Sequence, residues 1–290
     1  MTNTAFIQPL IFTDLDGSLL DHNSYSFAPA EPLLKKLETL DVPVIPITSK
    51  TFAEVVSLRI DLNNNHPFII ENGAAIAIPK DYFSTTPGDA IEKDDFWLIS
   101  NSEPRQHWLE LLMQKAQGFE GEFETFTSVV KEKGYRGLQD ITGLSLKQAE
   151  LSNKRNYSEP IHWLGNDQRK QEFIKQLTAA GGTLLQGGRF IALGGNIDKG
   201  KALLQLAALY QQDKSLSQIH TLAIGDSGND ISMLDAATTA IIIHSKKHPA
   251  PKVTRSSNLI LSSACGPEGW NESVALWLTN FSEIGSKNYG

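Results

Sequence analysis

The apolar positions of the first 80 residues switch between two periods. Short β-branched and apolar runs at 7–13, 42–47 and 68–70 are typical of buried strands. The segments between them, 32–40 and 51–62, carry apolar residues at helical spacing. Strands and helices in this alternating order predict a parallel sheet joined by right-handed crossovers.

The same alternation returns near residue 193. There we expect strands at 219–224, 239–243 and 259–261, and helices at 199–211, 230–236 and 268–281. Residues 83–192 mix strands and helices without this order, and a strand at 96–99 is assigned to them. The predicted fold class is α/β, with a Rossmann-like parallel-sheet core. Residues 1–82 and 193–290 form this discontinuous core, and residues 83–192 form an inserted α+β cap domain.

Composition narrows the classes of partner. The chain has 290 residues, 40% of them hydrophobic and 20% charged, as in ordinary soluble domains. A net charge of −7 argues against non-specific nucleic-acid binding. The single cysteine, Cys265, excludes an internal disulfide, and no apolar run approaches the length of a membrane span. The apolar run before Asp14 leads straight into the acidic segment, so we expect a cytoplasmic protein with no membrane partner. The oligomeric state stays open.

Two acidic clusters follow buried strands. Asp14-Leu15-Asp16-Gly17-Ser18 follows the first strand, and Gly225-Asp226-Ser227-Gly228-Asn229-Asp230 follows the strand at 219–224. Either cluster alone is compatible with a turn or a helix cap. Together, at the ends of parallel strands, they predict acids converging on the sheet edge where such folds bind ligands. Converging carboxylates need a cation, and Mg²⁺ is the natural candidate, which points to chemistry on a phosphate.

Two further polar residues fit the same edge. Thr48 ends the second strand, where its hydroxyl suits phosphate oxygens, although a cap for the helix beginning at Thr51 is an equal alternative. Lys199 begins a helix, where a cation opposes the helix dipole. This placement makes sense if Lys199 neutralises a carboxylate and a phosphate, the alternative being an ordinary surface lysine.

These four elements, in this order, resemble the motifs of the haloacid dehalogenase superfamily. The turn Glu71-Asn72-Gly73-Ala74 and the insertion are similar to its branch with a large α/β cap. Three further segments resemble the mannosyl-3-phosphoglycerate phosphatases: Arg155-Asn156-Tyr157-Ser158-Glu159-Pro160, Gly187-Gly188-Arg189-Phe190 and Gly266-Pro267-Glu268-Gly269-Trp270. In place of the Gly-Arg of many capped relatives, Ser49-Lys50 follows Thr48.

The resemblance implies a covalent mechanism. Asp14 is the expected nucleophile, forming an aspartyl-phosphate, and Asp16 the expected acid and then base. Mg²⁺ is expected between Asp14, the carbonyl of Asp16 and Asp226. Thr48 and Lys199 are expected to stabilise the transferring group. The expected substrate contacts are Thr48, Ser49, Asn72, Arg155, Glu159, Arg189 and Lys199, with Asn229 and Asp230 behind them.

The implied substrate is a phosphorylated sugar or glycerate, and the first expectation is mannosyl-3-phosphoglycerate. The alternatives within enzymes are a glucosyl-3-phosphoglycerate or sucrose-phosphate type of phosphatase, or a phosphomutase on the same scaffold. A non-catalytic phosphate-binding or receiver domain is the alternative of another class. Asp16 argues against a receiver, which has no use for an acid two residues after its acceptor.

Overall fold

A parallel sheet forms the centre of the molecule. The structure is a computed structural model that describes residues 7–187, 189–214 and 218–287. Five parallel strands follow the order β13-β12-β11-β1-β2. Their bounds are β1 (Ile7–Thr13), β2 (Val44–Pro46), β11 (Gln218–Gly225), β12 (Thr239–His244) and β13 (Leu259–Cys265). The predicted Rossmann-like core is confirmed.

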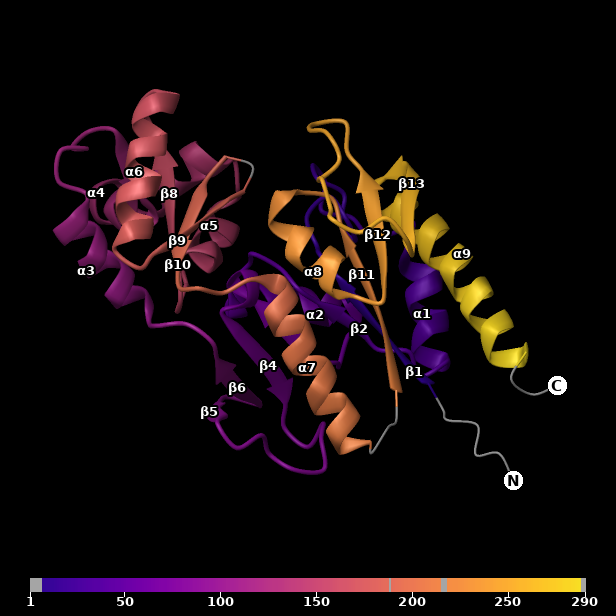
Figure 1. Cartoon of the computed structure of the whole chain (residues 1–290). Coiled ribbons are helices and arrows are strands. Elements are labelled where there is room, and N and C mark those ends of the chain that lie inside the picture. Colours follow the sequence, from indigo (N-terminus) through magenta and orange to yellow (C-terminus); the bar gives the residue numbers. More distant parts are fainter. Residues whose placement is uncertain (1–6, 188, 215–217, 288–290) are drawn as a thin grey trace.

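Helices cover both faces of this sheet (Figure 1). The helices α1 (Glu31–Thr39), α2 (Phe52–Leu62) and α9 (Gly266–Lys287) lie on one face, and α7 (Lys199–Asp213) and α8 (Ile231–Ala236) lie on the other. Successive side chains of a strand point to opposite faces. Ile11 therefore packs with the first group of helices, whereas Leu10 and Phe12 pack with the second. Burial on both faces explains the continuous apolar run of β1.

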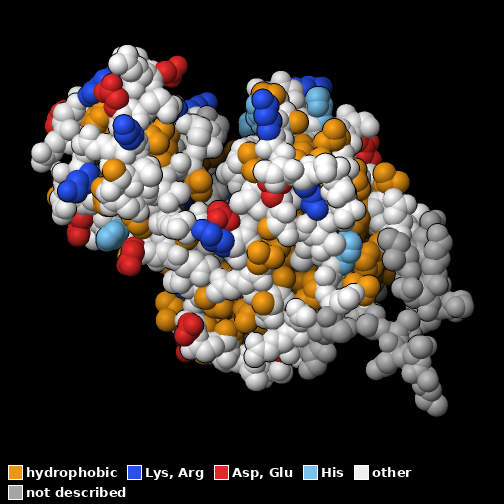
Figure 2. All heavy atoms as spheres, in the orientation of Figure 1, with side chains coloured by type: hydrophobic (Ala, Val, Ile, Leu, Met, Phe, Trp, Pro, Cys, Tyr) orange, Lys and Arg blue, Asp and Glu red, His pale blue; other side chains and the backbone are white. Residues whose placement is uncertain are grey.

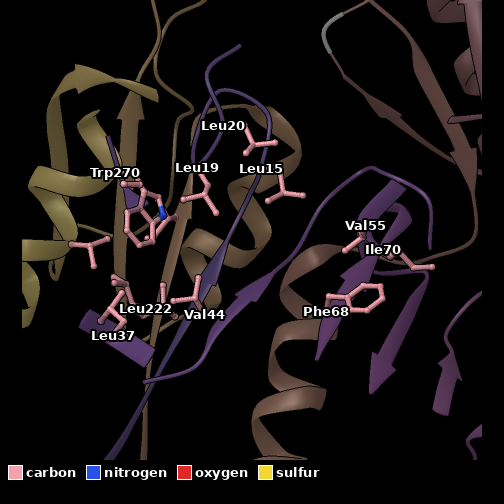
Figure 3. Packing of buried hydrophobic residues seen from close by; sticks show 14 of the residues in the cluster. Leu15, Leu19, Leu20, Leu37, Val44, Val55, Phe68, Ile70, Leu222 and Trp270 are labelled. Carbon is pink, nitrogen blue, oxygen red and sulfur yellow. The ribbon is translucent and has the colours of Figure 1, made fainter. Parts of the chain in front are cut away.

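Trp270 anchors the segment that follows β1. Its ring is fully buried in the hydrophobic cluster that contains Leu15, Leu19 and Leu20 (Figure 3). Its Nε1 donates a hydrogen bond to Thr13 Oγ1 at 3.0 Å. A large buried aromatic side chain with its polar atom satisfied is a strong packing element. The N-terminal part of α9 thus holds the acidic segment against the sheet.

A second sheet continues the core beyond β2. Its order is β3-β4-β6-β5, all antiparallel, and a bridge between Ile47 and Ile69 joins it to the parallel sheet. Its bounds are β3 (Phe68–Ile70), β4 (Ala75–Pro79), β5 (Ile91–Lys93) and β6 (Phe96–Ser100). The strand at 96–100 therefore pairs with the core sheet and not with the insertion. The division at residues 83 and 192 stays a prediction, and this pairing favours an insertion that begins after residue 100.

The remaining segment builds the cap. Its antiparallel sheet has the order β7-β8-β10-β9. The strands are β7 (Phe123–Thr125), β8 (Glu159–Trp163), β9 (Thr183–Gln186) and β10 (Ile191–Gly194). The helices are α3 (Arg105–Lys115), α4 (Phe126–Thr142), α5 (Leu146–Ser152) and α6 (Asp167–Ala179). Trp108, Phe173 and Ile161 share a hydrophobic cluster of their own, which is the core expected of a separate unit.

The surface is hollowed between the cap and the lobe formed by β12 and β13 (Figure 2). Charged side chains of both signs are scattered over the cap lobe in this view. None of the helices in the described ranges is long and apolar enough to cross a bilayer.

Candidate active site at the carboxyl edge of the parallel sheet

The two acidic clusters meet because their strands are neighbours. β1 pairs with β11 in a register that places Thr13 opposite Ile224. Asp14 N donates to the carbonyl of Ile224 at 2.8 Å, so the chain leaves both strands at one point of the sheet edge. Carboxylate oxygens of Asp14, Asp226 and Asp230 lie within 4.8 Å of one another, and all three residues are buried. The structure thus brings together Asp14 and Asp226, which are 212 positions apart in the sequence.

Lys199 is the cation of this cluster. As the first residue of α7 it is fully buried, and its Nζ lies 2.6 Å from Asp14 Oδ1 and 2.6 Å from Asp230 Oδ1. Burial opposes its charge, but the two carboxylates outweigh burial and raise its pKa. Lys199 is therefore a fixed positive charge beside Asp14, and the surface-lysine alternative is wrong.

Both carboxylate oxygens of Asp230 accept hydrogen bonds from other groups of the protein. Its Oδ1 accepts from Lys199, and its Oδ2 accepts the backbone N–H groups of Asp226 and Ser227, both at 3.0 Å. These bonds fix the loop after β11 and hold Lys199 in place. Asp14 and Asp226 are consequently the carboxylates left to hold a metal ion.

Unpartnered oxygens show that a cation suits this cluster. Asp226 Oδ1 and Asp16 Oδ1 are buried, and neither has a hydrogen-bond partner among the described residues. Buried acceptors without partners are costly, and oxygens of this kind are the ligands of hard divalent cations. The Asp16–Gly17 turn lies against Asp226: an added methyl at Gly17 would meet Asp226 Oδ2 at 2.7 Å. The residues present therefore fit a divalent metal held by Asp14 and Asp226, with this turn beside them.

Burial makes these acids hard to ionise without a cation. It raises the pKa of Asp226 to about 7, with further increase from Asp230 and partial relief from Lys199. Burial also raises the pKa of Asp14 well above its ordinary value, although Lys199 opposes the rise. A bound cation would restore both carboxylates to the charged form at neutral pH.

Thr48 lies two residues after β2 and is buried. Its Oγ1 accepts a hydrogen bond from Lys50 N at 3.2 Å, and its backbone N–H donates to the carbonyl of Ile69. The cap of α2 is Thr51, which forms a capping box with Glu54. The alternative in which Thr48 caps that helix is therefore wrong. Among the described residues none accepts a hydrogen bond from the Thr48 hydroxyl, so its proton can be donated to a ligand.

Lys50, which the sequence analysis did not assign to the site, pairs with Asp16. Its Nζ lies 2.7 Å from Asp16 Oδ2 and 5.2 Å from the centre of the Tyr25 ring. Burial opposes its charge, but Asp16 and Glu54 outweigh burial and raise its pKa. The Ser49-Lys50 pair after Thr48, noted above as a departure from Gly-Arg, was the available sequence signal.

Glu71 is a second residue that the sequence analysis did not assign. It is buried, and its carboxylate accepts from the backbone N–H of Asn156 at 2.8 Å, that of Tyr157 at 3.2 Å and the hydroxyl of Ser158 at 2.6 Å. It thereby ties the segment before β8 of the cap to the core. Its neighbour Asn72 accepts from Asn229 Nδ2 at 3.1 Å, which links this turn to the loop after β11.

The three expected cap contacts have different surroundings. Arg155 donates to the carbonyl of Ser49 at 3.1 Å and so lies at the junction with the core. Glu159 is fully buried, and it pairs with Arg105 and Thr127 of the cap. Arg189 is exposed and donates to the carbonyl of Ile141, also of the cap. Its neighbour Gly188 lies outside the described residues. Arg155 is thus the one of these three with a partner beside Thr48.

His248 also reaches the acidic cluster. Its Nε2 lies 3.2 Å from Asp226 Oδ2, and its side chain is about a third exposed at 35%. The polar segment between β12 and β13 carries no periodic pattern, so no sequence signal pointed to this contact.

Comparison with known proteins agrees with this geometry. The sequence profile of the haloacid dehalogenase-like hydrolases matches residues 11–258. The chain belongs to this family. It is 34% identical over 270 residues to a glucosyl-3-phosphoglycerate/mannosyl-3-phosphoglycerate phosphatase of Methanococcoides burtonii, covering 91% of this chain and 95% of that protein. A protein of the same name from Persephonella marina is 31% identical over 278 residues, with 91% and 95% covered. The chain is accordingly a phosphoric monoester hydrolase.

Solved structures share the fold. The sucrose-phosphatase of Synechocystis, in complex with sucrose and phosphate, superposes with a TM-score of 0.59 at 17% identity, covering 93% of this chain and 98% of that one. A protein of Thermoplasma acidophilum gives a TM-score of 0.63 at 17% identity, covering 92% and 96%. At these identities the likeness shows the capped haloacid dehalogenase fold alone.

Proposed function

We propose that this protein hydrolyses mannosyl-3-phosphoglycerate to mannosylglycerate and phosphate with Mg²⁺ as its metal. Glucosyl-3-phosphoglycerate is the second candidate substrate, because both curated relatives carry both names. The observation that carries the reaction type is the buried group of Asp14, Lys199 and Asp226 at the sheet edge. The choice of substrate rests on the relatives, which match this chain over 91% of its length.

Two displacements at phosphorus account for hydrolysis. A carboxylate oxygen of Asp14 attacks the phosphorus, and the bond from phosphorus to the glycerate oxygen breaks. Asp16 gives its proton to that departing oxygen. Asp16 then takes a proton from water, which attacks the phosphorus and breaks the bond to Asp14, releasing phosphate. Lys50 Nζ, which lies 2.7 Å from Asp16 Oδ2, holds this carboxyl group in place near the turn at Gly17.

Charge stabilisation comes from the residues around Asp14. Lys199 balances the charge of Asp14 and, with the Thr48 hydroxyl, stabilises the oxygens of the transferring group. Mg²⁺, when bound by Asp14 and Asp226, would reduce the repulsion between the nucleophile and the phosphate. Glu71 and Arg155 fix the cap against the core beside Thr48, which favours exclusion of water from the site.

Phosphate release from a panel of sugar phosphates tests this proposal. The panel contains mannosyl-3-phosphoglycerate, glucosyl-3-phosphoglycerate and sucrose phosphate, each with Mg²⁺ and with chelator. We expect the two phosphoglycerates to have the highest kcat/KM and chelator to abolish turnover. Asp14→Asn is expected to fold and to be inactive, while Asp61→Asn, a change of an exposed acid on α2, retains activity. If both phosphoglycerates rank below sucrose phosphate, the proposed substrate is wrong.

A further inference from the structure

Lys50 presents a partly buried ammonium group beside the proposed acid. Its side chain is 15% exposed, and its Nζ lies 2.7 Å from Asp16 Oδ2. The Tyr25 ring lies on another side, 5.2 Å from Nζ. A charge that is partly removed from water requires compensation, which Asp16 and the ring supply in part.

The backbone holds this ammonium at a fixed place relative to the phosphate-binding residue. Lys50 N donates to Thr48 Oγ1 at 3.2 Å, and the Lys50 carbonyl accepts from Glu71 N at 3.0 Å. The next residue, Thr51, caps α2. Lys50 therefore stands on a rigid turn between Thr48 and the helix, as a specificity residue must.

Donor capacity remains at this ammonium. Lysine carries three N–H donors, and within the described part of the chain Asp16 is the single carboxylate within ion-pair distance of Lys50 Nζ. An anionic ligand group beside Asp16 would use the remaining donors and complete the compensation of the partly buried charge.

We propose that Lys50 binds the carboxylate of the glycerate part of the leaving group, which Asp16 protonates as it departs. Lys50 would thereby select leaving groups that carry a carboxylate. This inference rests on the proposed function. Asp16 must lie within about 2.6–3.2 Å of the departing oxygen to protonate it. The departing oxygen is bonded to C3 of the glycerate, and the carboxylate carbon is two bonds further along. Because Nζ is 2.7 Å from Asp16 Oδ2, that carboxylate comes within reach of Lys50.

A matched pair of substrates tests the selection. Mannosyl-3-phosphoglycerate is compared with its primary carboxamide, which is nearly isosteric but uncharged, in the wild type, Lys50→Met and Lys50→Arg. We expect the wild type to favour the carboxylate by about tenfold to a hundredfold in kcat/KM. Lys50→Met should lose most of this preference, and Lys50→Arg should keep part of it. Lys80→Met is the control, because Lys80 also has an acid partner, Glu92, and lies over a ring, that of Trp97, on the β4 side.

The outcomes separate two roles of Lys50, selection of the carboxylate and positioning of Asp16. An equal fall in kcat/KM for both substrates in Lys50→Met, with the preference intact, would overturn the proposal and leave Lys50 as a residue that positions Asp16. No preference in the wild type would overturn it as well. If Lys50→Met does not fold, stronger inhibition of the wild type by D-glycerate than by D-glyceramide is the expected result, and equal inhibition overturns the proposal. Failure of the wild type to hydrolyse either phosphoglycerate of the earlier panel would instead overturn the proposed function.

Discussion

Lys199 Nζ lies 2.6 Å from Asp14 Oδ1, in an ion pair whose cation is fully buried. The nucleophile proposed here therefore has its counter-charge built into the fold, from the first residue of α7. The same lysine is expected to affect both the free energy of unfolding and catalysis, because its loss would leave buried carboxylates without a compensating charge.

Removal of this cation is expected to destabilise the protein and to abolish activity. Lys199→Met leaves Asp14 and Asp230 buried without their partner, which costs about 3–5 kcal/mol of the free energy of unfolding. Lys201→Met is the matched control two residues along α7, where an exposed pair with Asp198 at 3.3 Å contributes about 0–1 kcal/mol. Urea unfolding measures both. Equal stability of the two variants would contradict a structural role for the buried pair.

The stabilisation of the protein by Mg²⁺ is expected to increase with pH. Burial raises the pKa of Asp226 to about 7 and that of Asp14 well above its ordinary value in the metal-free protein. The folded state then binds more protons than the unfolded state between the ordinary pKa and the raised one. Metal-free stability therefore falls as pH rises through this window, and Mg²⁺ competes with protons at the same oxygens. Thermal unfolding with Mg²⁺ and with chelator at about pH 5.5 and pH 8 measures the difference. A metal-induced shift of the same size at both pH values would argue against these ligands.

A methyl group at Gly17 is expected to weaken metal binding. In Gly17→Ala the new Cβ would meet Asp226 Oδ2 at 2.7 Å and displace that carboxylate. Gly118 has the same φ of +86° but nothing within 4 Å of an added Cβ, so Gly118→Ala carries the same backbone strain of about 1–2 kcal/mol without the clash. Activity titrated with Mg²⁺ should show a higher metal requirement in Gly17→Ala alone. An equal requirement in both variants would place the metal away from Asp226.

Much of the site could be predicted because it follows from strand order. Parallel strands that end in acids bring Asp14 and Asp226 to one edge wherever the strands are neighbours, and β1 and β11 are. Lys199 was the weakest of these predictions, since a lysine at a helix start is usually exposed. Its burial depends on Asp230, which accepts from it 31 residues along the chain.

Other features depend on contacts that no local pattern reports. The apolar run at 96–99 indicates a strand, but its partner β4 is set by tertiary packing, so its assignment to the insertion did not match the pairing. Glu71 has the sequence surroundings of a turn, and its three hydrogen bonds go to residues 85 to 87 positions away.

Trapping of the phosphorylated enzyme tests the central claim most directly. The claim is that Asp14, beside Lys199, becomes covalently phosphorylated, and that Asp16 then helps water to remove the phosphoryl group. The enzyme is quenched in acid while it turns over mannosyl-3-phosphoglycerate with Mg²⁺. The peptide that carries the phosphoryl group is then identified by mass spectrometry. We predict a phosphoryl group on Asp14 in the wild type and none in Asp14→Asn. In Asp16→Asn the phosphorylated enzyme should accumulate when the substrate has a leaving group that needs no proton, because the base that activates water is missing. Steady turnover with no phosphoryl group on Asp14, or with the phosphoryl group on another residue, would contradict the account.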